Sequence, residues 1–312
     1  MMLQSLIPAR ARTGIAALTF AAVAMPLSAA ADTFVFSTGN PDGLMATAVR
    51  PDSPGKFEIE AGDDFVLTQQ TLITGASFTG LIPSGASTSN ISNVVVEVYR
   101  VFPADSDVNR TSGPPIFSTA NVPTRVNSPS DVALDERKSS EGSLNFIPIV
   151  LQSSFTANNS VQPGGIHPKP NQTTLGNGPV TGQEAVISVN FTMPFNLPAD
   201  HYFFVPQVEL SSGDFLWLSA PKPIVVPPGT PFPPGFTDLQ SWTRDDSAGG
   251  IAPDWLRVGT DIVGGTPAPQ FNAAFVLNGV TVPAPIAGAG LPGLILAGGV
   301  LLLLARRRQI AY

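Results

Sequence analysis

The chain has 312 residues, of which 29 are glycine and 32 are proline, and only 12% are charged, whereas 43% are hydrophobic. So much glycine and proline argues against long helices and against a coiled coil, and the hydrophobic content excludes a charge-driven disordered chain. Acidic residues outnumber basic ones by 23 to 16. This balance excludes a basic nucleic-acid binder, so we expect no nucleic-acid partner.

Residues 1–31 follow the order of a secretory signal peptide. Two arginines precede an apolar run over residues 14–25, and small residues continue up to Ala31. An N-terminal membrane anchor is the alternative, but this run is shorter than the roughly 20 residues that a spanning helix needs. We therefore expect a signal peptidase to cleave after Ala31, which makes Asp32 the first residue of the mature protein.

A second apolar segment covers residues 286–305 and is followed by Arg306, Arg307 and Arg308. A helix of about 20 apolar residues crosses the hydrocarbon layer of a membrane. The alternative is a buried core helix, but such helices seldom lack a polar face. Because positive residues beside a span stay on the cytoplasmic side, we expect one C-terminal transmembrane helix, with the body outside the cytoplasm.

The tail begins with a short motif formed by Val282, Pro283, Ala284 and Pro285, continues through the glycine-rich apolar stretch GAGLPGL and ends in the arginines. This three-part order resembles the PEP-CTERM class of sorting signals of Gram-negative bacteria, in its VPxP variant, with Ala284 at the position of the name-giving glutamate. The resemblance implies that residues 283–312 hold an exported protein in the inner membrane until an exosortase, a membrane transpeptidase, processes the tail. It also implies a final location at the cell surface or outside the cell.

The body between these ends is more acidic than the whole chain. Five of the 16 basic residues belong to the two ends, and neither end contains an acid, so residues 32–282 carry 11 basic and 23 acidic residues, a net charge of −12. The chain contains no cysteine. Disulfides, thiolate chemistry and cysteine-bound metals are therefore excluded.

The body shows a series of short strand patterns separated by turn residues. The clearest strand pattern covers residues 93–102, where Glu97 shares a face with Val95 and Tyr99 and further valines occupy the opposite face. Similar patterns cover residues 143–151, 184–193, 201–210, 214–220 and 271–277. Many short strands with Gly, Pro, Asn and Ser between them predict an all-β fold, a single large β-sandwich of jelly-roll type over residues 32–282.

Local patterns add three expectations about this sandwich. The turn at Ser211–Gly213 predicts a hairpin between the strands at 201–210 and 214–220. Trp217, which alternates with Phe215, is expected in the core. Three long segments, 105–137, 161–179 and 221–236, are rich in proline and glycine or lack strand patterns, and we expect long loops there, with unrecognised edge strands as the alternative.

Two further stretches resemble exported bacterial β-sandwich domains of the choice-of-anchor type. One is residues 57–82, where Asp-Asp-Phe precedes an apolar strand that ends near Phe78-x-Gly80, and the other is the sequence LPADHY at 197–202. Such domains stand before interchangeable anchoring tails. The resemblance therefore implies architecture and location, but no activity.

The sequence contains few of the residues and motifs that nucleophilic catalysis requires. The Gly-x-Ser-x-Gly pattern of a hydrolase elbow is missing, and only His167 and His201 are available as imidazole bases. The two histidines also lack the spacing of a metal site. We therefore expect no enzymatic activity and name no catalytic residue.

Asp105, Asp107 and Asn109 imitate the beginning of a calcium-binding EF-hand loop. The imitation ends there, because Arg110 stands where the turn glycine belongs and Ile116 where the bidentate glutamate belongs. Ca²⁺ bound by the three oxygen-bearing residues is the only cofactor that the sequence suggests. Turn formation by these residues is the alternative.

Trp242 and Trp255 lie in stretches rich in charged residues, with Asp245 and Asp246 close to the first of them. An indole ring that is exposed presents an apolar face to a sugar ring, so these four residues are the ligand-binding candidates, with extracellular polysaccharide as the candidate ligand. Burial of the tryptophans is the alternative. We expect an exported, non-enzymatic protein of structural or binding type. The other function considered is a secreted carbohydrate-active hydrolase that uses a carboxylate pair.

Overall fold

Two β-sheets dominate the computed structural model, which describes residues 31–110, 122–166, 173–246 and 254–283, together with Gly299 and Leu302. Residues 1–30 of the expected signal peptide lie outside the described residues. So do Ala284, Pro285, nearly all of the expected span and the arginines at 306–308. Within the described residues, no helix is both long and apolar enough to cross a membrane.

Among the described residues, one sheet has nine strands and the other has six. The larger sheet contains β1 (Thr33–Ser37), β2 (Met45–Val49), β4 (Thr71–Pro83), β7 (Leu144–Ala157), β8 (Asn159–Val161), β9 (Val180–Leu197), β11 (Phe215–Ala220), β14 (Asn272–Ala273) and β15 (Phe275–Thr281). The smaller sheet contains β3 (Ile59–Leu67), β5 (Ile91–Arg100), β6 (Asp135–Lys138), β10 (Asp200–Leu210), β12 (Trp242–Asp245) and β13 (Leu256–Arg257). Short helical turns in the connections are η1 (Thr88–Asn90), η2 (Ser139–Glu141), η3 (Pro163–Gly165) and η4 (Val258–Val263). The expected all-β class is confirmed.

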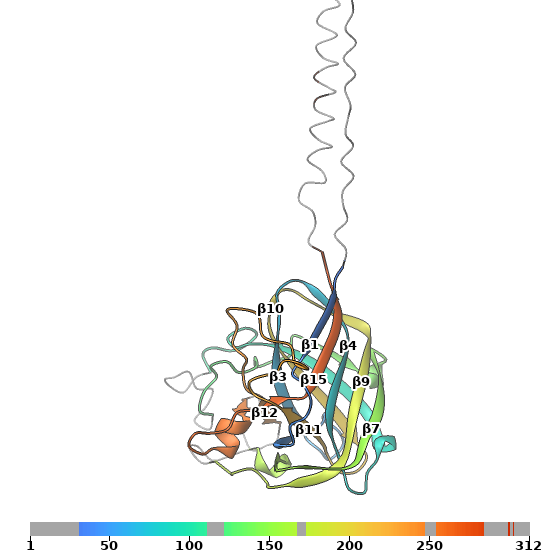
Figure 1. The fold of residues 1–312 in the computed structure, drawn as a ribbon, viewed down its shortest axis with the longest axis vertical. Helices are drawn as coiled ribbons and strands as arrows, with labels where there is room; N and C mark the ends of the chain where they lie inside the picture. Colours follow the sequence, from blue (N-terminus) through green and yellow to red (C-terminus); the bar gives the residue numbers. More distant parts are fainter. Residues whose placement is uncertain are drawn as a thin grey trace, which may run out of the picture. The chain divides into compact units, whose positions relative to one another are not determined.

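Strand β4 organises the larger sheet (Figure 1). Along one edge it pairs with β9 over its whole length, and β9 pairs in turn with β7. Its other edge is shared, because β15 pairs with the first part of β4 and β11 pairs with the last part. Strands β1, β2 and β8 extend these two branches, and only the β2–β8 pair is parallel among the described pairs. The smaller sheet has the order β13-β12-β3-β10-β5-β6.

The main hydrophobic core lies between the facing sides of the two sheets. Its aromatic centre joins Phe204 of β10 to Phe275 of β15, whose rings stack with centroids 5.0 Å apart. Trp217 of β11 is 2% exposed and donates from Nε1 to the Ala274 carbonyl at 2.9 Å, so its expected place in the core is confirmed. Val94, Val96 and Val98 of β5 also face this core, and the strand pattern at 93–102 predicted that they share one face.

The hairpin expected at Ser211–Gly213 is wrong. Strands β10 and β11 do follow one another through this turn, but β10 belongs to the smaller sheet and β11 to the larger one. Both edges of β10 are already occupied, by β3 and β5. The turn therefore carries the chain across the sandwich, and the two apolar strands meet through their side chains in the core rather than through backbone hydrogen bonds.

Two smaller hydrophobic clusters lie outside the main core, and one of them covers the outer face of the smaller sheet. This outer aromatic cluster consists of Tyr99, Phe203, Val205, Leu239, Trp242 and Trp255. Val101 and Ala133 pack against it from the two ends of the segment 101–134. Long connections thus bury a face that a simple sandwich leaves exposed. Of the segments expected as loops, 221–236 carries no strand, whereas 105–137 and 161–179 include parts of β6 and β8.

Candidate functional site

The outer face of the smaller sheet carries a buried group of polar side chains, here termed the acidic cluster: Glu58, Glu60, Glu97, Tyr99, Gln207 and Arg244. Because side chains alternate along a strand, these residues point away from the main core at the positions between its apolar residues. Glu60 is 3% exposed, Glu97 9%, Tyr99 2%, Gln207 0% and Arg244 8%. These five side chains are therefore nearly closed to solvent, whereas Glu58 is half-buried.

Hydrogen bonds join the members of the acidic cluster across four segments. The Tyr99 hydroxyl donates to Glu60 Oε1 at 2.6 Å, and Arg244 Nη2 donates to the Tyr99 oxygen at 2.9 Å. Arg244 Nε also donates to Glu60 Oε2. Gln207 Nε2 donates to Glu97 Oε2 at 3.0 Å and to Glu58 Oε1 at 2.9 Å. Each carboxylate thus has a partner, and the arginine stands among three glutamates.

Burial determines the protonation of this cluster. Burial and then the charges of Glu60 and Glu58 raise the pKa of Glu97 to about 9. Burial and then Glu60 raise the pKa of Glu58 to about 7. Burial and Glu60 also hold the pKa of Tyr99 far above its ordinary value. Burial lowers the pKa of Arg244, but its anionic neighbours raise it more. At neutral pH, Glu97 is therefore protonated and Arg244 is charged.

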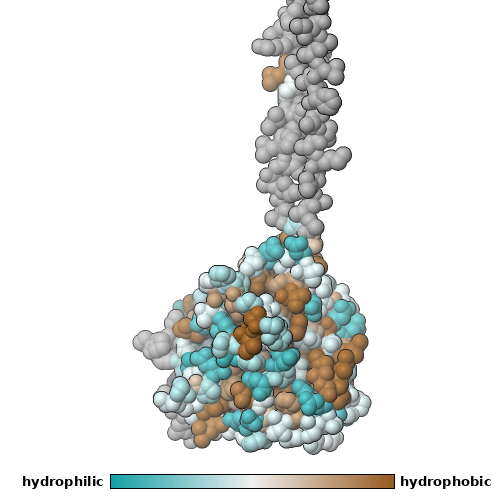
Figure 2. All heavy atoms as spheres, viewed as in Figure 1, coloured by the Kyte–Doolittle hydropathy of each residue, from teal (hydrophilic) through white to brown (hydrophobic). Residues whose placement is uncertain are grey.

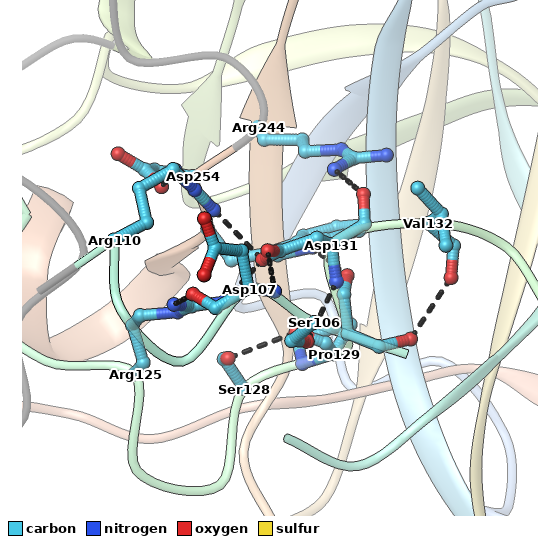
Figure 3. Close-up of polar contacts among 12 residues, drawn as sticks. Ser106, Asp107, Arg110, Arg125, Ser128, Pro129, Asp131, Val132, Arg244 and Asp254 are labelled. Atoms are coloured by element: carbon cyan, nitrogen blue, oxygen red, sulfur yellow. Dashed lines mark hydrogen bonds and ion pairs between the residues drawn. The ribbon is translucent and has the colours of Figure 1, made fainter. Parts of the chain in front are cut away.

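The segment that covers the cluster is held by a second network, which centres on Asp131 (Figure 3). Asp131 Oδ1 accepts from Arg110 at 2.7 Å and also from Arg125. Its Oδ2 accepts from the backbone N–H of Asp107 at 2.9 Å. The Asp131 carbonyl accepts from Arg244 Nη1 at 3.0 Å, so the two networks share one guanidinium.

Trp242 and Trp255 are not exposed sugar platforms. They are 1% and 3% exposed and belong to the outer aromatic cluster. The alternative expectation, that the two tryptophans are buried, is confirmed. Trp255 Nε1 donates to the Ser130 carbonyl at 3.0 Å, and its ring lies 4.5 Å from the Arg244 guanidinium. The neighbouring charges suggested exposure, but Arg244 is itself buried against the tryptophan.

Asp245 and Asp246 form no common surface with the two tryptophans. Asp245 is 1% exposed and points to the opposite face of β12 from Trp242, because the two are an odd number of residues apart. Asp246 follows the strand, and its backbone N–H donates to the Glu58 carbonyl at 3.0 Å. The four ligand-binding candidates therefore do not form one surface.

The three calcium candidates make separate local contacts. Asp105 binds the Arg100 guanidinium with both oxygens, at 2.7 Å from Nε. Asp107 Oδ1 accepts from the backbone N–H of Asn109 at 2.9 Å, which is an Asx turn. Among the described residues, no group of three or more His, Cys, Asp or Glu side chains could hold a metal ion. The contacts of Asp105 and Asp107 therefore support the alternative to calcium binding, in which these residues form turns.

The structure also reveals an Asp–His pair that the sequence did not predict. His201 Nε2 lies 2.6 Å from Asp64 Oδ2, and both Asp64 oxygens accept from the backbone N–H of Leu239 at 3.1 Å. Burial raises the pKa of Asp64 to about 6, although His201 opposes this shift. In the described part of the chain, no hydrogen bond joins His201 to a serine or threonine. Among these residues, the pair is therefore not joined to a hydroxyl in the manner of a Ser-His-Asp triad.

Most of the acidic cluster was also missed from the sequence. Glu97 was noticed because it interrupts a run of valines, but Glu60 and Arg244 lie in strands that were not predicted. A polar residue within an apolar run is the signal common to Glu97 of β5 and Gln207 of β10, whereas Arg244 stands between Thr243 and Asp245 in β12. This signal marks a polar contact but does not identify the partner.

Comparison with known proteins returns no match to any protein family, curated protein or solved structure. The carboxylates of the acidic cluster bind an arginine, a glutamine and a tyrosine, and parts of residues 101–110 and 122–134 pack over this face of the smaller sheet.

Proposed function

We propose that this chain is an exported bacterial β-sandwich protein of structural or binding type, without enzymatic activity. The observation that carries this proposal is the burial of the candidate carboxylates, since Glu60 and Glu97 are 3% and 9% exposed and both contact the Tyr99 hydroxyl. A glycosidase needs two carboxyl groups on either side of a bound sugar, about 5 to 10 Å apart. The hydrolase alternative receives no support from this geometry.

The proposal includes export and anchoring. It rests on the order of the sequence: a signal-peptide pattern, an acidic body, the Val282–Pro285 motif, an apolar segment long enough to span a membrane, and three arginines. In this proposal the body lies in the periplasm while the tail spans the inner membrane. An exosortase-like transpeptidase then processes the PEP-CTERM-like tail, and the body reaches the cell surface or the extracellular matrix.

The proposal also specifies the sandwich as jelly-roll-like. In a jelly roll, successive strands alternate between two facing sheets. Two parts of the chain support this description, because the series β2, β3, β4, β5 and the series β9, β10, β11, β12 each alternate between the larger and the smaller sheet. The alternation places loops at both ends of the sandwich, where polysaccharide or matrix components are the candidate ligands.

Expression of the full chain in a Gram-negative host that contains an exosortase tests the export proposal. Cell fractionation is expected to find the protein in the inner membrane or at the surface, with Asp32 at its mature N-terminus. A variant that lacks residues 283–312 is expected to be soluble in the periplasm or the medium. The matched control replaces Val282–Pro285 with alanines and keeps the apolar segment, so it stays in the inner membrane unprocessed. Full-length protein in the cytoplasm, or a truncated body that aggregates, contradicts the proposal.

A further inference from the structure

The outer face of the larger sheet carries little charge over five neighbouring strands: β1, β15, β4, β9 and β7. The one charged residue of these strands, Glu184 of β9, is 4% exposed and accepts from Gln152 Nε2 at 2.9 Å. The side chains that define this neutral face are Thr33, Val35, Leu72, Ser77, Thr79, Asn145, Ile147, Ile149, Val186, Ser188, Asn190, Val276, Asn278 and Val280. None of them is charged, aromatic or buried. The outer face of the smaller sheet differs in two ways: it carries the acidic cluster, and long connecting segments cover it.

The register of the strands makes the neutral face continuous. Ser77 of β4 lies opposite Val276 of β15 on one side and opposite Ser188 of β9 on the other, and Ser188 lies opposite Ile147 of β7. Ile147 is 65% exposed, although it is a large apolar residue. Figure 2 shows apolar residues gathered on the side of the body where β7 and β9 lie in Figure 1.

Charge makes this face the favoured place for two copies to meet. Residues 32–282 carry a net charge of −12, so two bodies repel one another wherever their acidic surfaces approach. Contact through the neutral face separates those charges and covers exposed valine and isoleucine side chains. We propose that the neutral face binds the neutral face of a second copy of this chain, in a symmetric dimer with two packed sheets.

The dimensions of the face are sufficient for such a dimer. Five strands at a spacing of about 4.8 Å give a width of about 24 Å, and eight residues along β4 at about 3.3 Å each give about 26 Å. The face therefore covers about 600 Å² on each copy, which is at the lower limit of a specific interface of about 1,200 Å² in total. A reversible dimer of about micromolar affinity is expected. Sugar is a less suitable occupant, because the face offers no aromatic ring for stacking.

Sedimentation equilibrium of the full chain in detergent micelles tests the dimer. Ser77→Glu places a carboxylate in the middle of the face, where it must lose water when the second copy binds, and is expected to weaken dimerisation at least tenfold. The matched control is Ser84→Glu, which adds the same charge in the exposed turn after β4 and is expected to dimerise like the wild type. Ile147→Lys at the exposed edge provides a second disruptive variant if Ser77→Glu does not fold.

Salt dependence gives a second readout. Added NaCl screens the repulsion between the acidic bodies but leaves an uncharged contact intact, so dimerisation is expected to strengthen between about 20 and 300 mM NaCl. A wild-type chain that stays monomeric at about 100 μM, far above the expected dissociation constant, overturns the proposal. So does equal dimerisation of the Ser77→Glu and Ser84→Glu variants, which assigns self-association to another part of the chain. Binding of a polysaccharide that Ser77→Glu abolishes, without dimerisation, also overturns it.

Discussion

Arg244 of β12 lies directly opposite Glu60 of β3 in the antiparallel register of the smaller sheet, and its Nε donates to the Glu60 carboxylate. The same guanidinium donates to the Tyr99 hydroxyl and to the Asp131 carbonyl. One side chain therefore links two paired strands, a third strand and the segment that covers them. The charge of Arg244 also offsets that of Glu60 where little water is present.

Replacement of Arg244 by methionine tests this relationship. The variant keeps a side chain of similar length but leaves Glu60 as a buried carboxylate without its cation, which costs about 3–5 kcal/mol of unfolding free energy. The measurement is urea unfolding followed by tryptophan fluorescence. The control is Arg100→Met, since Arg100 pairs with Asp105 and its side chain is 36% exposed; a loss of about 0–1 kcal/mol is expected. Equal losses in the two variants contradict the role of Arg244.

The acidic cluster predicts lower stability in alkaline solution. The pKa of Glu97 is raised to about 9 and that of Glu58 to about 7, whereas both return toward the ordinary value of about 4.3 when the chain unfolds. Between the unfolded and the folded pKa values, the folded state therefore binds more protons than the unfolded state. The stabilisation by these two protonated glutamates is complete below the unfolded pKa. It is lost as the pH rises through about 7 for Glu58 and about 9 for Glu97.

Thermal melting between about pH 6 and pH 10 measures the effect, and the wild-type Tm is expected to fall across this range. Glu97→Gln keeps the shape of the protonated carboxyl without its titration, so the variant is expected to lose less stability over the same range. Glu141→Gln is the charge-matched control, because the Glu141 side chain is 63% exposed, and it is expected to follow the wild type. An unchanged pH dependence in Glu97→Gln contradicts the raised pKa.

Asp131→Ala is expected to loosen the segment 101–134. The substitution removes the acceptor of Arg110 and of Arg125, and Arg125 is 2% exposed. Groups left unsatisfied in such a place cost about 1–3 kcal/mol each. Hydrogen exchange is expected to become faster in this segment and to stay slow in β4 and β9. The control is Asp135→Ala, since the Asp135 side chain is 41% exposed; faster exchange throughout the chain in both variants contradicts a local role for Asp131.

Gly80 is expected to tolerate no side chain. It lies where β4 passes from pairing with β15 to pairing with β11, and a Cβ there meets the Leu216 carbonyl and the Phe215 ring at 2.5 Å. Gly80→Ala therefore forces the strands apart, at a cost of about 1–3 kcal/mol. A Cβ at Gly164 meets nothing within 4 Å, so Gly164→Ala provides a neutral control. Similar melting temperatures for both variants contradict the close approach of β4 and β11.

The sequence predicted strands best where one face is apolar in strict alternation. Strand β5 is the example, because the pattern placed Glu97 and Val94, Val96 and Val98 on opposite faces, and the structure places these three valines in the main core. Strand β3 was not predicted, since all nine of its residues are buried and they include Glu60, Asp63 and Asp64. Both of its faces are covered, so no alternation of polar and apolar residues marks the strand.

The candidate site could not be assembled from local patterns. Arg244 and Glu60 are separated by 184 residues in the chain and meet only because β12 pairs with β3. Pairing also explains the error at Trp242 and Trp255, where neighbouring charges suggested exposure although Arg244 pairs with Glu60 across the sheet and Asp254 pairs with Arg110. A charged residue in the sequence indicates an exposed stretch only where no oppositely charged group pairs with it in the folded interior.

The central claim is that the carboxylates of the acidic cluster are structural rather than catalytic. The most direct test incubates the purified full-length protein with a panel of bacterial polysaccharides and measures new reducing ends, for the wild type and for Glu60→Gln and Glu97→Gln. We expect no turnover by any of the three proteins, while the two substitutions change thermal stability. Turnover by the wild type that either substitution abolishes in a folded protein would contradict the claim.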